Sequence, residues 1–318
     1  MRLRRGLIAG ALLLLAGLTA FVTWRDRRDP LALLPQPHHE LAADRTPATV
    51  ADGRRLQHVV LHDPKRGDIG LTISLPEPLP AKPLPILLVL GGLGTGESNI
   101  RYLTDAGDNA IVGYDWPIPV RFYDGPAGFL RLMKLYRRLM AIPAQVTSAL
   151  EWVAAEPWAD RRISLLGFSL GALAAPAIEH VAERDGRPIG WTILAYGGAP
   201  LGALVAANPH VRPGWVRSLL APIVDGLLAP LQPTRHLPDL TSQFLVLEGT
   251  DDALIPAAAS ARLRDAVPEP KTVERFAGDH VGVGPDKAAL LAQIIADSRA
   301  WLIDKGAIDP PPDATATQ

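Results

Sequence analysis

The segment ISLLGFSLGALAAPAIEHVAE (163–183) runs from an apolar strand pattern, through Gly167-Phe168-Ser169-Leu170-Gly171, into a helical pattern. The pentapeptide matches G-x-S-x-G between a strand and a helix, a context in which the serine stands exposed on a strained turn. The two glycines are needed because side chains there would collide with neighbouring backbone. The pentapeptide alone also fits an ordinary tight turn, but its context favours a nucleophilic Ser169.

The elements on either side predict an α/β fold. Apolar runs typical of strands alternate with longer helical patterns, and several runs are continuously apolar, as in strands buried on both faces. This order predicts a mostly parallel, twisted sheet with helices on both faces, and an antiparallel edge formed by the first two strands. The expected strands are 57–62, 69–75, 86–91, 109–115, 163–168, 191–197, 244–249 and 272–277; the expected helices are 129–140, 143–156, 170–184, 257–266 and 285–304.

A serine nucleophile needs a base, and the base needs an acid that orients it. Asp251 and Asp252 follow the strand FLVLEG (244–249), and His280 follows the strand TVERFA (272–277). Both loops leave the carboxyl ends of strands, where open α/β sheets bind their ligands. His280 is the only histidine after both Ser169 and the acidic loop, so it is the predicted base. Position in the sequence leaves the choice between the two aspartates open.

These three motifs resemble the α/β-hydrolase superfamily over residues 57–304. The resemblance implies that Asp252 is the acid, since the family loop commonly reads glycine, two variable residues and then the catalytic aspartate. It also implies an oxyanion hole formed by the backbone N–H groups of Leu170 and Leu93, and no metal or organic cofactor. The loop Gly91-Gly92 departs from the His-Gly of many members.

The glycine loop LLVLGGLGTG (87–96) also suggests a dinucleotide-binding turn, with Asp115 ending the next strand. The spacing argues against this alternative. The third glycine would fall at Glu97, where an acidic side chain opposes a pyrophosphate.

About 45 residues separate two of the predicted strands, and long loops in compact domains are usually functional. In the family this position corresponds to a lid, here about 198–242. Its stretch 215–231 is apolar and could roof an acyl pocket, although an ordinary packed helical excursion is the alternative. His210 and His236 in this segment are predicted to be surface or structural residues.

Composition limits the other possibilities. The chain has 318 residues, 32 Lys and Arg against 33 Asp and Glu, and no cysteine. The absence of excess positive charge removes the main electrostatic contribution to nucleic-acid affinity, so no nucleic-acid partner is expected. Without cysteine there is no disulfide framework, thiolate metal site or cysteine nucleophile.

The first 28 residues are predicted to be a membrane anchor or signal segment. Arg2, Arg4 and Arg5 precede an uncharged run, residues 7–24, whose length lies at the short end of a transmembrane helix. An anchor with an exported catalytic domain is favoured, and a cleaved signal or a packed core helix are the alternatives. Residues 29–55 are predicted to be a linker, 56–304 the catalytic domain and 305–318 a disordered tail.

The motifs together predict a serine hydrolase that cleaves a carboxylic ester or thioester through an acyl-enzyme. A small-molecule or lipid-like substrate is favoured. The alternatives are a peptidase or acyltransferase of the same fold, and a non-catalytic binding protein that keeps the fold.

Overall fold

The computed structural model describes residues 17, 23–25, 27–92, 94–103, 107–117, 128–208, 211–282 and 285–310. Its centre is a ten-stranded sheet with strand order β1-β3-β4-β6-β5-β7-β8-β9-β10, and β2 also pairs with β3. The strands are β1 (Ala42–Arg45), β2 (Thr49–Ala51), β3 (Arg54–His62), β4 (Ile69–Pro76), β5 (Leu84–Leu90), β6 (Ala110–Tyr114), β7 (Ala159–Phe168), β8 (Trp191–Ala195), β9 (Gln243–Gly249) and β10 (Lys271–Phe276).

The strands from β6 to β10 along this order pair in parallel, and β1 to β4 pair antiparallel with their neighbours. All eight strands predicted from the sequence form, as β3 to β10. The central strands are buried along most of their length because helices cover both faces, which is why they read as continuous apolar runs.

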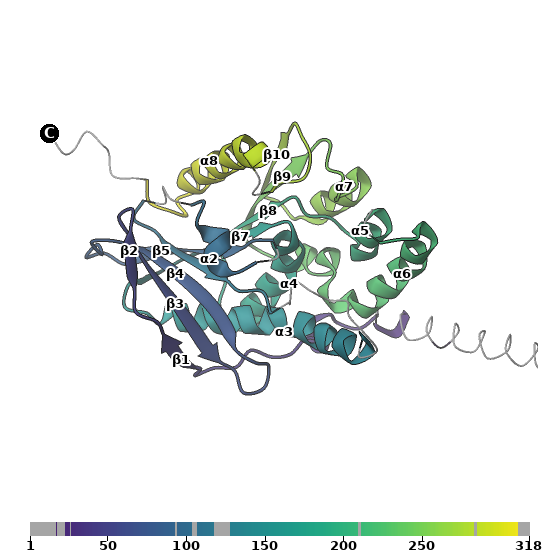
Figure 1. Ribbon diagram of the computed structural model, residues 1–318, viewed down its shortest axis with the longest axis horizontal. Helices are drawn as coiled ribbons and strands as arrows, with labels where there is room; N and C mark the ends of the chain where they lie inside the picture. The colour runs from purple at the N-terminus through teal and green to yellow at the C-terminus, as the bar shows by residue number, and fades with distance from the viewer. Residues whose placement is uncertain are drawn as a thin grey trace, which may run out of the picture.

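The helices cover the sheet on two sides, with α8 on one side and α3 and α4 on the other (Figure 1). One apolar core joins the sheet to α3 and α4, and a second joins it to α2 and α8. The predicted α/β architecture is therefore confirmed. The α-helices are α2 (Gly96–Ile100), α3 (Gly128–Ala154), α4 (Leu170–Arg184), α5 (Leu201–Ala207), α6 (Gly214–Leu227), α7 (Ala257–Ala266) and α8 (Ala288–Asp304); the 3₁₀ helices are η1 (Leu31–Leu33), η2 (Ala229–Leu231), η3 (Pro233–Arg235), η4 (Leu237–Asp239) and η5 (Pro285–Lys287).

Helix α3 replaces two helices that the sequence led us to expect. Pro143 lies inside it, where a proline removes one intrahelical hydrogen bond. The helix continues because residues 140–150 are all buried, so tertiary packing outweighs the local cost. The hydroxyl of Thr147 also donates to the Pro143 carbonyl at 2.9 Å.

The stretch predicted as a linker, 29–55, packs against the domain. It contains η1, with Leu31 and Leu34 buried, and the strands β1 and β2, which both pair with β3. The His38 amide donates to Ser148 on α3 at 2.8 Å. The sheet thus begins at Ala42, before the predicted boundary.

The start of the predicted tail is also part of the fold. Ala307 and Ile308 are buried, and the Asp309 carboxylate pairs with Lys82 and Arg162 at 2.9 and 2.8 Å. Residues 311–318 lie outside the described part of the chain.

The prediction of a membrane-spanning signal anchor is wrong. Across the described residues, no helix combines the length and hydrophobicity that crossing a membrane requires, and the predicted membrane partner is left without support. Of the run 7–24, the structure describes only Gly17, Thr23 and Trp24. Export of the catalytic domain stays a prediction.

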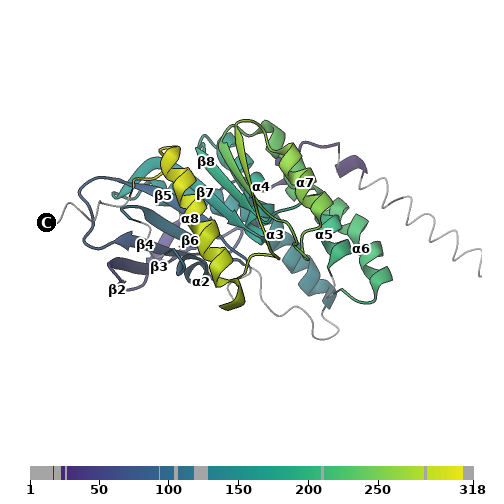
Figure 2. The same ribbon diagram turned by 90° about the horizontal axis from the view of Figure 1, so that it is seen from above.

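The predicted lid, 198–242, folds into α5, α6 and the three short helices η2, η3 and η4. Both views place α5 and α6 beside each other at one end of the molecule (Figure 1, Figure 2). The segment is therefore helical, which agrees both with the predicted lid and with an ordinary packed helical excursion.

Candidate active site

Ser169 occupies a strained turn between β7 and α4. Its backbone has φ 53° and ψ −111°, a region that residues other than glycine rarely adopt. The Ser169 amide donates to the Ala195 carbonyl of β8 at 2.8 Å, which fixes the turn against the sheet.

The two flanking glycines are needed for close backbone approach. A Cβ atom on Gly171 would lie 1.9 Å from the Leu90 carbonyl oxygen, and one on Gly167 would lie 2.8 Å from the Gly171 backbone. Both distances are shorter than any tolerated contact. The turn that exposes Ser169 therefore depends on glycine at both positions.

A chain of two hydrogen bonds joins Ser169, His280 and Asp252. The Ser169 Oγ lies 2.8 Å from His280 Nε2, and His280 Nδ1 lies 2.7 Å from Asp252 Oδ2. The His280 and Asp252 side chains are only 10% and 4% exposed. With His280 protonated on Nδ1, its Nε2 is free to accept the Ser169 proton, as a general base must.

The two adjacent aspartates have different hydrogen-bond partners. Asp252 Oδ1 accepts the amides of Leu254 and Ile255, both at 2.8 Å, which leaves Oδ2 aimed at His280. Asp251 instead accepts the Thr250 hydroxyl at 2.8 Å and is exposed. Asp252 is the residue placed to orient the imidazole.

Asp279 connects the acidic loop to the histidine loop, a role that the sequence analysis missed. Its Oδ1 accepts the Ala253 amide at 2.9 Å, and its Oδ2 lies 3.1 Å from Lys287 Nζ. The backbone amides of Ala253 and His280, followed by Lys287, hold the pKa of Asp279 well below its usual range. The only sequence feature that pointed to Asp279 was its position directly before His280.

Tyr196 is a second residue that the sequence analysis missed. Its ring meets the His280 ring edge to face, with centroids 5.6 Å apart and planes at 87°. The Tyr196 backbone has a positive φ of 58°, and its ring fills the space beside Gly249, where a Cβ would lie 2.7 Å from the ring. Burial, followed by the charge of Asp252, raises the pKa of Tyr196 to about 12.

The predicted oxyanion hole is described in part. Leu170 is the first residue of α4, so its amide has no intrahelical acceptor, and the positive end of the helix dipole lies at the same point. Leu93, the second predicted donor, lies outside the described residues.

Neighbouring side chains hold two glycines of the glycine loop, Gly91 and Gly96. The Asn99 amide covers Gly91, where a Cβ would lie 2.2 Å from the Asn99 Oδ1, and the Trp116 indole donates to the Gly91 carbonyl at 3.1 Å. Asp115, which the rival dinucleotide reading used, accepts the Gly96 amide. These contacts hold Gly91 and Gly96, and Gly91 lines the same cavity as Ser169.

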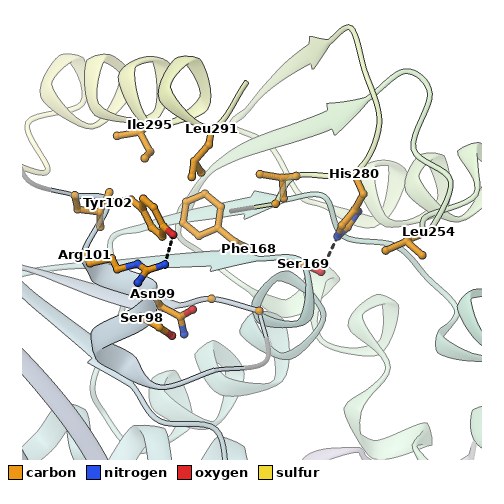
Figure 3. A pocket seen from close by; sticks show the side chains of 15 residues that line it. Ser98, Asn99, Arg101, Tyr102, Phe168, Ser169, Leu254, His280, Leu291 and Ile295 are labelled. Atoms are coloured by element: carbon orange, nitrogen blue, oxygen red, sulfur yellow. Dashed lines mark hydrogen bonds between the residues drawn. The ribbon is translucent and has the colours of Figure 1, made fainter. Parts of the chain in front are cut away.

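A cavity of about 310 Å³ opens over Ser169 and His280 (Figure 3). Its size is at the lower end of small-molecule sites. On one side lie the polar groups Ser98, Asn99 and Arg101, and the opposite wall is apolar and comes partly from α8. The lining residues are Gly91, Gly92, Ser98, Asn99, Arg101, Tyr102, Leu103, Phe168, Ser169, Leu254, His280, Val281, Gly282, Leu291 and Ile295.

A second cavity, of about 240 Å³, lies under the lid and is almost wholly apolar. Among the described residues its lining includes Leu170 but neither Ser169 nor His280. The residues come from α3, α4, the predicted lid and the segment after β6: Trp116, Leu139, Ile142, Pro143, Leu170, Leu173, Ala174, Leu201, Leu204, Val205, Val224, Leu228 and Leu231. The predicted lid thus contributes to an apolar cavity beside Leu170, the predicted oxyanion donor.

Of the two histidines in the predicted lid, the structure describes only His236. His236 is fully buried, with its Nε2 2.8 Å from the Pro230 carbonyl and its Nδ1 3.1 Å from His180 Nδ1, so it is structural as predicted. His210 lies outside the described residues.

One group of potential metal ligands occurs within the described ranges, formed by His39, Glu151 and Asp185. Both carboxylates also pair with Arg187, at 2.7 and 3.4 Å, so their charge is already compensated. The arrangement is that of an ion-pair network on the protein surface.

Comparison with known proteins places the chain by its fold. No protein-family model matches the sequence, and no curated protein matches it significantly. Three similar solved structures are acetyl xylan esterases from a Thermoanaerobacterium species and a Paenibacillus species, and an S-formylglutathione hydrolase from Agrobacterium tumefaciens.

The structural agreement is extensive although the sequences differ. The three structures have TM-scores of 0.59, 0.59 and 0.56 at identities of 13%, 16% and 15%. The matches cover 87%, 85% and 81% of this chain, and 93%, 98% and 98% of the other chains. With its mostly parallel sheet, its glycine-flanked serine turn and these neighbours, the chain has the α/β-hydrolase fold.

Proposed function

We propose that the protein is a serine hydrolase that cleaves a carboxylic ester or thioester through an acyl-enzyme intermediate. The observation that carries the proposal is the hydrogen-bonded chain from Ser169 through His280 to Asp252, at 2.8 and 2.7 Å. Acyl transfer is the reaction that uses all three of these hydrogen-bonded residues, the serine, the histidine and the aspartate.

In the first half-reaction, Ser169 Oγ attacks the substrate carbonyl carbon while His280 Nε2 takes the hydroxyl proton. Asp252 stabilises the imidazolium that forms, through the bond to Nδ1. The negative charge on the carbonyl oxygen is bonded by the Leu170 amide, with Leu93 as the predicted second donor. The intermediate then expels the alcohol or thiol, which leaves with the proton from His280.

In the second half-reaction, His280 takes a proton from water as the water oxygen attacks the acyl-enzyme. The new tetrahedral intermediate expels Ser169 Oγ, which recovers a proton from His280. The products are a carboxylic acid and the free enzyme, so no cofactor enters the balance.

The substrate proposal rests on two supports. The cavity at Ser169 has the volume of a small-molecule site. The similar structures are, by name, acetyl xylan esterases and an S-formylglutathione hydrolase. A small or lipid-like ester or thioester is therefore favoured over a peptide, which remains the alternative along with acyl transfer to another alcohol.

The proposal is tested with p-nitrophenyl acetate and a fluorophosphonate probe. Ser169→Ala should abolish turnover and labelling, while Ser98→Ala should keep both. Ser98 is a matched control because it lines the same cavity and donates only to the Thr95 carbonyl, at 2.8 Å. Failure of the wild-type protein to react with either reagent would favour the non-catalytic binding protein.

A further inference from the structure

The cavity over Ser169 does not end beside the catalytic residues. A neighbouring cavity of about 280 Å³ has four lining residues in common with it, namely Tyr102, Leu103, Phe168 and Ile295. The two cavities therefore adjoin at these four residues. Phe168 is the residue directly before the nucleophile, so the neighbouring cavity begins next to the reacting carbonyl.

The neighbouring cavity is mostly apolar and lies between α8 and the sheet. Leu87 of β5 and Leu166 of β7 line it from the sheet, and Ala292 and Ala296 line it from α8. Both alanines are exposed, so the cavity opens to solvent along the helix. Protein interiors rarely leave spaces larger than a water molecule, so an apolar space of this size beside a reactive serine is suited to an apolar ligand group.

The direction of the cavity decides which part of an ester would enter it. His280 must hand its proton to the leaving group, so the leaving group has to lie on the His280 side of Ser169. Figure 3 shows Phe168, Leu291 and Ile295 on the opposite side of Ser169 from His280 and Leu254. The acyl group, which points away from the leaving group, therefore faces Phe168 and α8.

We propose that the acyl chain of the substrate extends from Ser169 past Phe168 into the cavity between α8 and the sheet, so that the enzyme prefers esters of medium-length apolar acids. This inference rests on the proposed function, because it needs an acyl group on Ser169. The transfer of apolar surface out of water then raises kcat/KM by up to about fourfold for each methylene that reaches the cavity.

The apolar cavity under the lid is the competing site for the chain. It lies beside Leu170 and is lined by Ala174 of α4, but its described lining lacks Ser169. The α8 cavity is favoured because it shares walls with the space that contains both Ser169 and His280.

The experiment measures kcat/KM for p-nitrophenyl esters from acetate to dodecanoate. The wild-type protein should gain at least tenfold between acetate and hexanoate. Ala296→Trp fills the α8 cavity and Ala296→Asp places a charge on its wall, so both should lose at least tenfold on octanoate while acetate turnover stays within about twofold. Ala292→Trp provides a second filling variant if Ala296→Trp does not fold.

Matched control variants distinguish an effect of filling the α8 cavity from a general effect of substitution on α8. Ala300 is exposed on α8 one turn after Ala296 and is absent from the cavity lining, so Ala300→Trp and Ala300→Asp should keep the wild-type chain-length profile. Ala174→Phe, in the cavity under the lid, should keep it as well.

Two outcomes would overturn the inference. One is an unchanged octanoate-to-acetate ratio in the folded Ala296 and Ala292 variants. The other is loss of long-chain turnover in Ala174→Phe alone, which would assign the chain to the lid cavity. Both leave acetate hydrolysis and the proposed function intact, whereas absence of turnover on every ester by the wild-type protein would contradict the function itself.

Discussion

Tyr196 holds His280 from the side, with its ring edge to face against the imidazole at a centroid distance of 5.6 Å. Tyr196 leaves the carboxyl end of β8, so the contact connects the sheet directly to the predicted base. The imidazole is thus positioned by two neighbours, Asp252 through a hydrogen bond and Tyr196 through packing.

Removal of the Tyr196 ring should loosen His280. Tyr196→Ala is expected to lower kcat by about tenfold to a hundredfold with little change in KM, because the loss concerns alignment of the base. Tyr196→Phe should keep near wild-type kcat, since the hydroxyl is buried without a hydrogen-bond partner among the described residues. Equal losses in both variants on p-nitrophenyl acetate would show that the hydroxyl matters instead of the ring.

The two aspartates of the acidic loop should differ strongly. Asp252→Asn is expected to lower kcat by about 10⁴, since the bond that fixes the histidine tautomer is lost. Asp251→Asn should cost less than about tenfold, because its carboxylate faces Thr250 and solvent and its charge is screened. Saturating ester kinetics on both variants provide the measurement, and comparable losses would mean that the loop acts through its charge alone.

Asp279 should stabilise the arrangement of the two catalytic loops. Asp279→Asn is expected to lower kcat by about tenfold, and Lys287→Gln by less, because the backbone amides contribute more than Lys287 to the lowered pKa. A carboxyl with a lowered pKa stabilises the fold fully above its ordinary value near 3.8 and loses this effect as the pH falls further. Because the pKa of Asp279 in the folded protein lies well below 3.8, its carboxylate stays ionised there. The ratio of wild-type kcat to Asp279→Asn kcat should therefore be constant from about pH 7 to about pH 4. A ratio that falls toward one within this range would contradict this role.

His236 should make the stability of the protein depend on pH. Burial lowers the pKa of His236 to about 4 from 6.5, so the folded state keeps it neutral while the unfolded state binds a proton. Stability from this residue is therefore complete above pH 6.5 and is lost as the pH falls toward 4, by up to about 3 kcal/mol.

Denaturant unfolding at pH 7.5 and 4.5 measures the effect of His236. His236→Gln removes the titrating group and keeps a donor for the Pro230 carbonyl, so its unfolding free energy should change less between the two pH values. The same pH dependence in both proteins would assign it to other groups.

Much of the site could be predicted because it is encoded locally. The turn around Ser169 requires glycine at two fixed positions between a strand and a helix, and the order of the three residues follows the order of the strands. The contacts that support the site are different in kind. Tyr196 reaches His280, and Asp279 reaches Ala253 of the acidic loop, only after distant strands pair, so their residue types carried no signal.

The differences elsewhere in the fold also have physical causes. Pro143 suggested a helix boundary, but the complete burial of the surrounding residues keeps α3 continuous. The stretch before residue 56 lacks a sustained period, yet backbone pairing with β3 makes strands of residues 42–45 and 49–51, since an edge strand needs hydrogen bonds more than an apolar pattern.

The central claim is that Ser169 Oγ becomes acylated during turnover, and mass spectrometry of the acid-quenched protein tests it most directly. Wild-type protein mixed with p-nitrophenyl octanoate should gain the mass of one octanoyl group on the peptide that contains Ser169. His280→Ala should accumulate little of this species, because the nucleophile then lacks its base. Turnover without any acyl group on that peptide, or an acyl group on a different residue, would contradict the account.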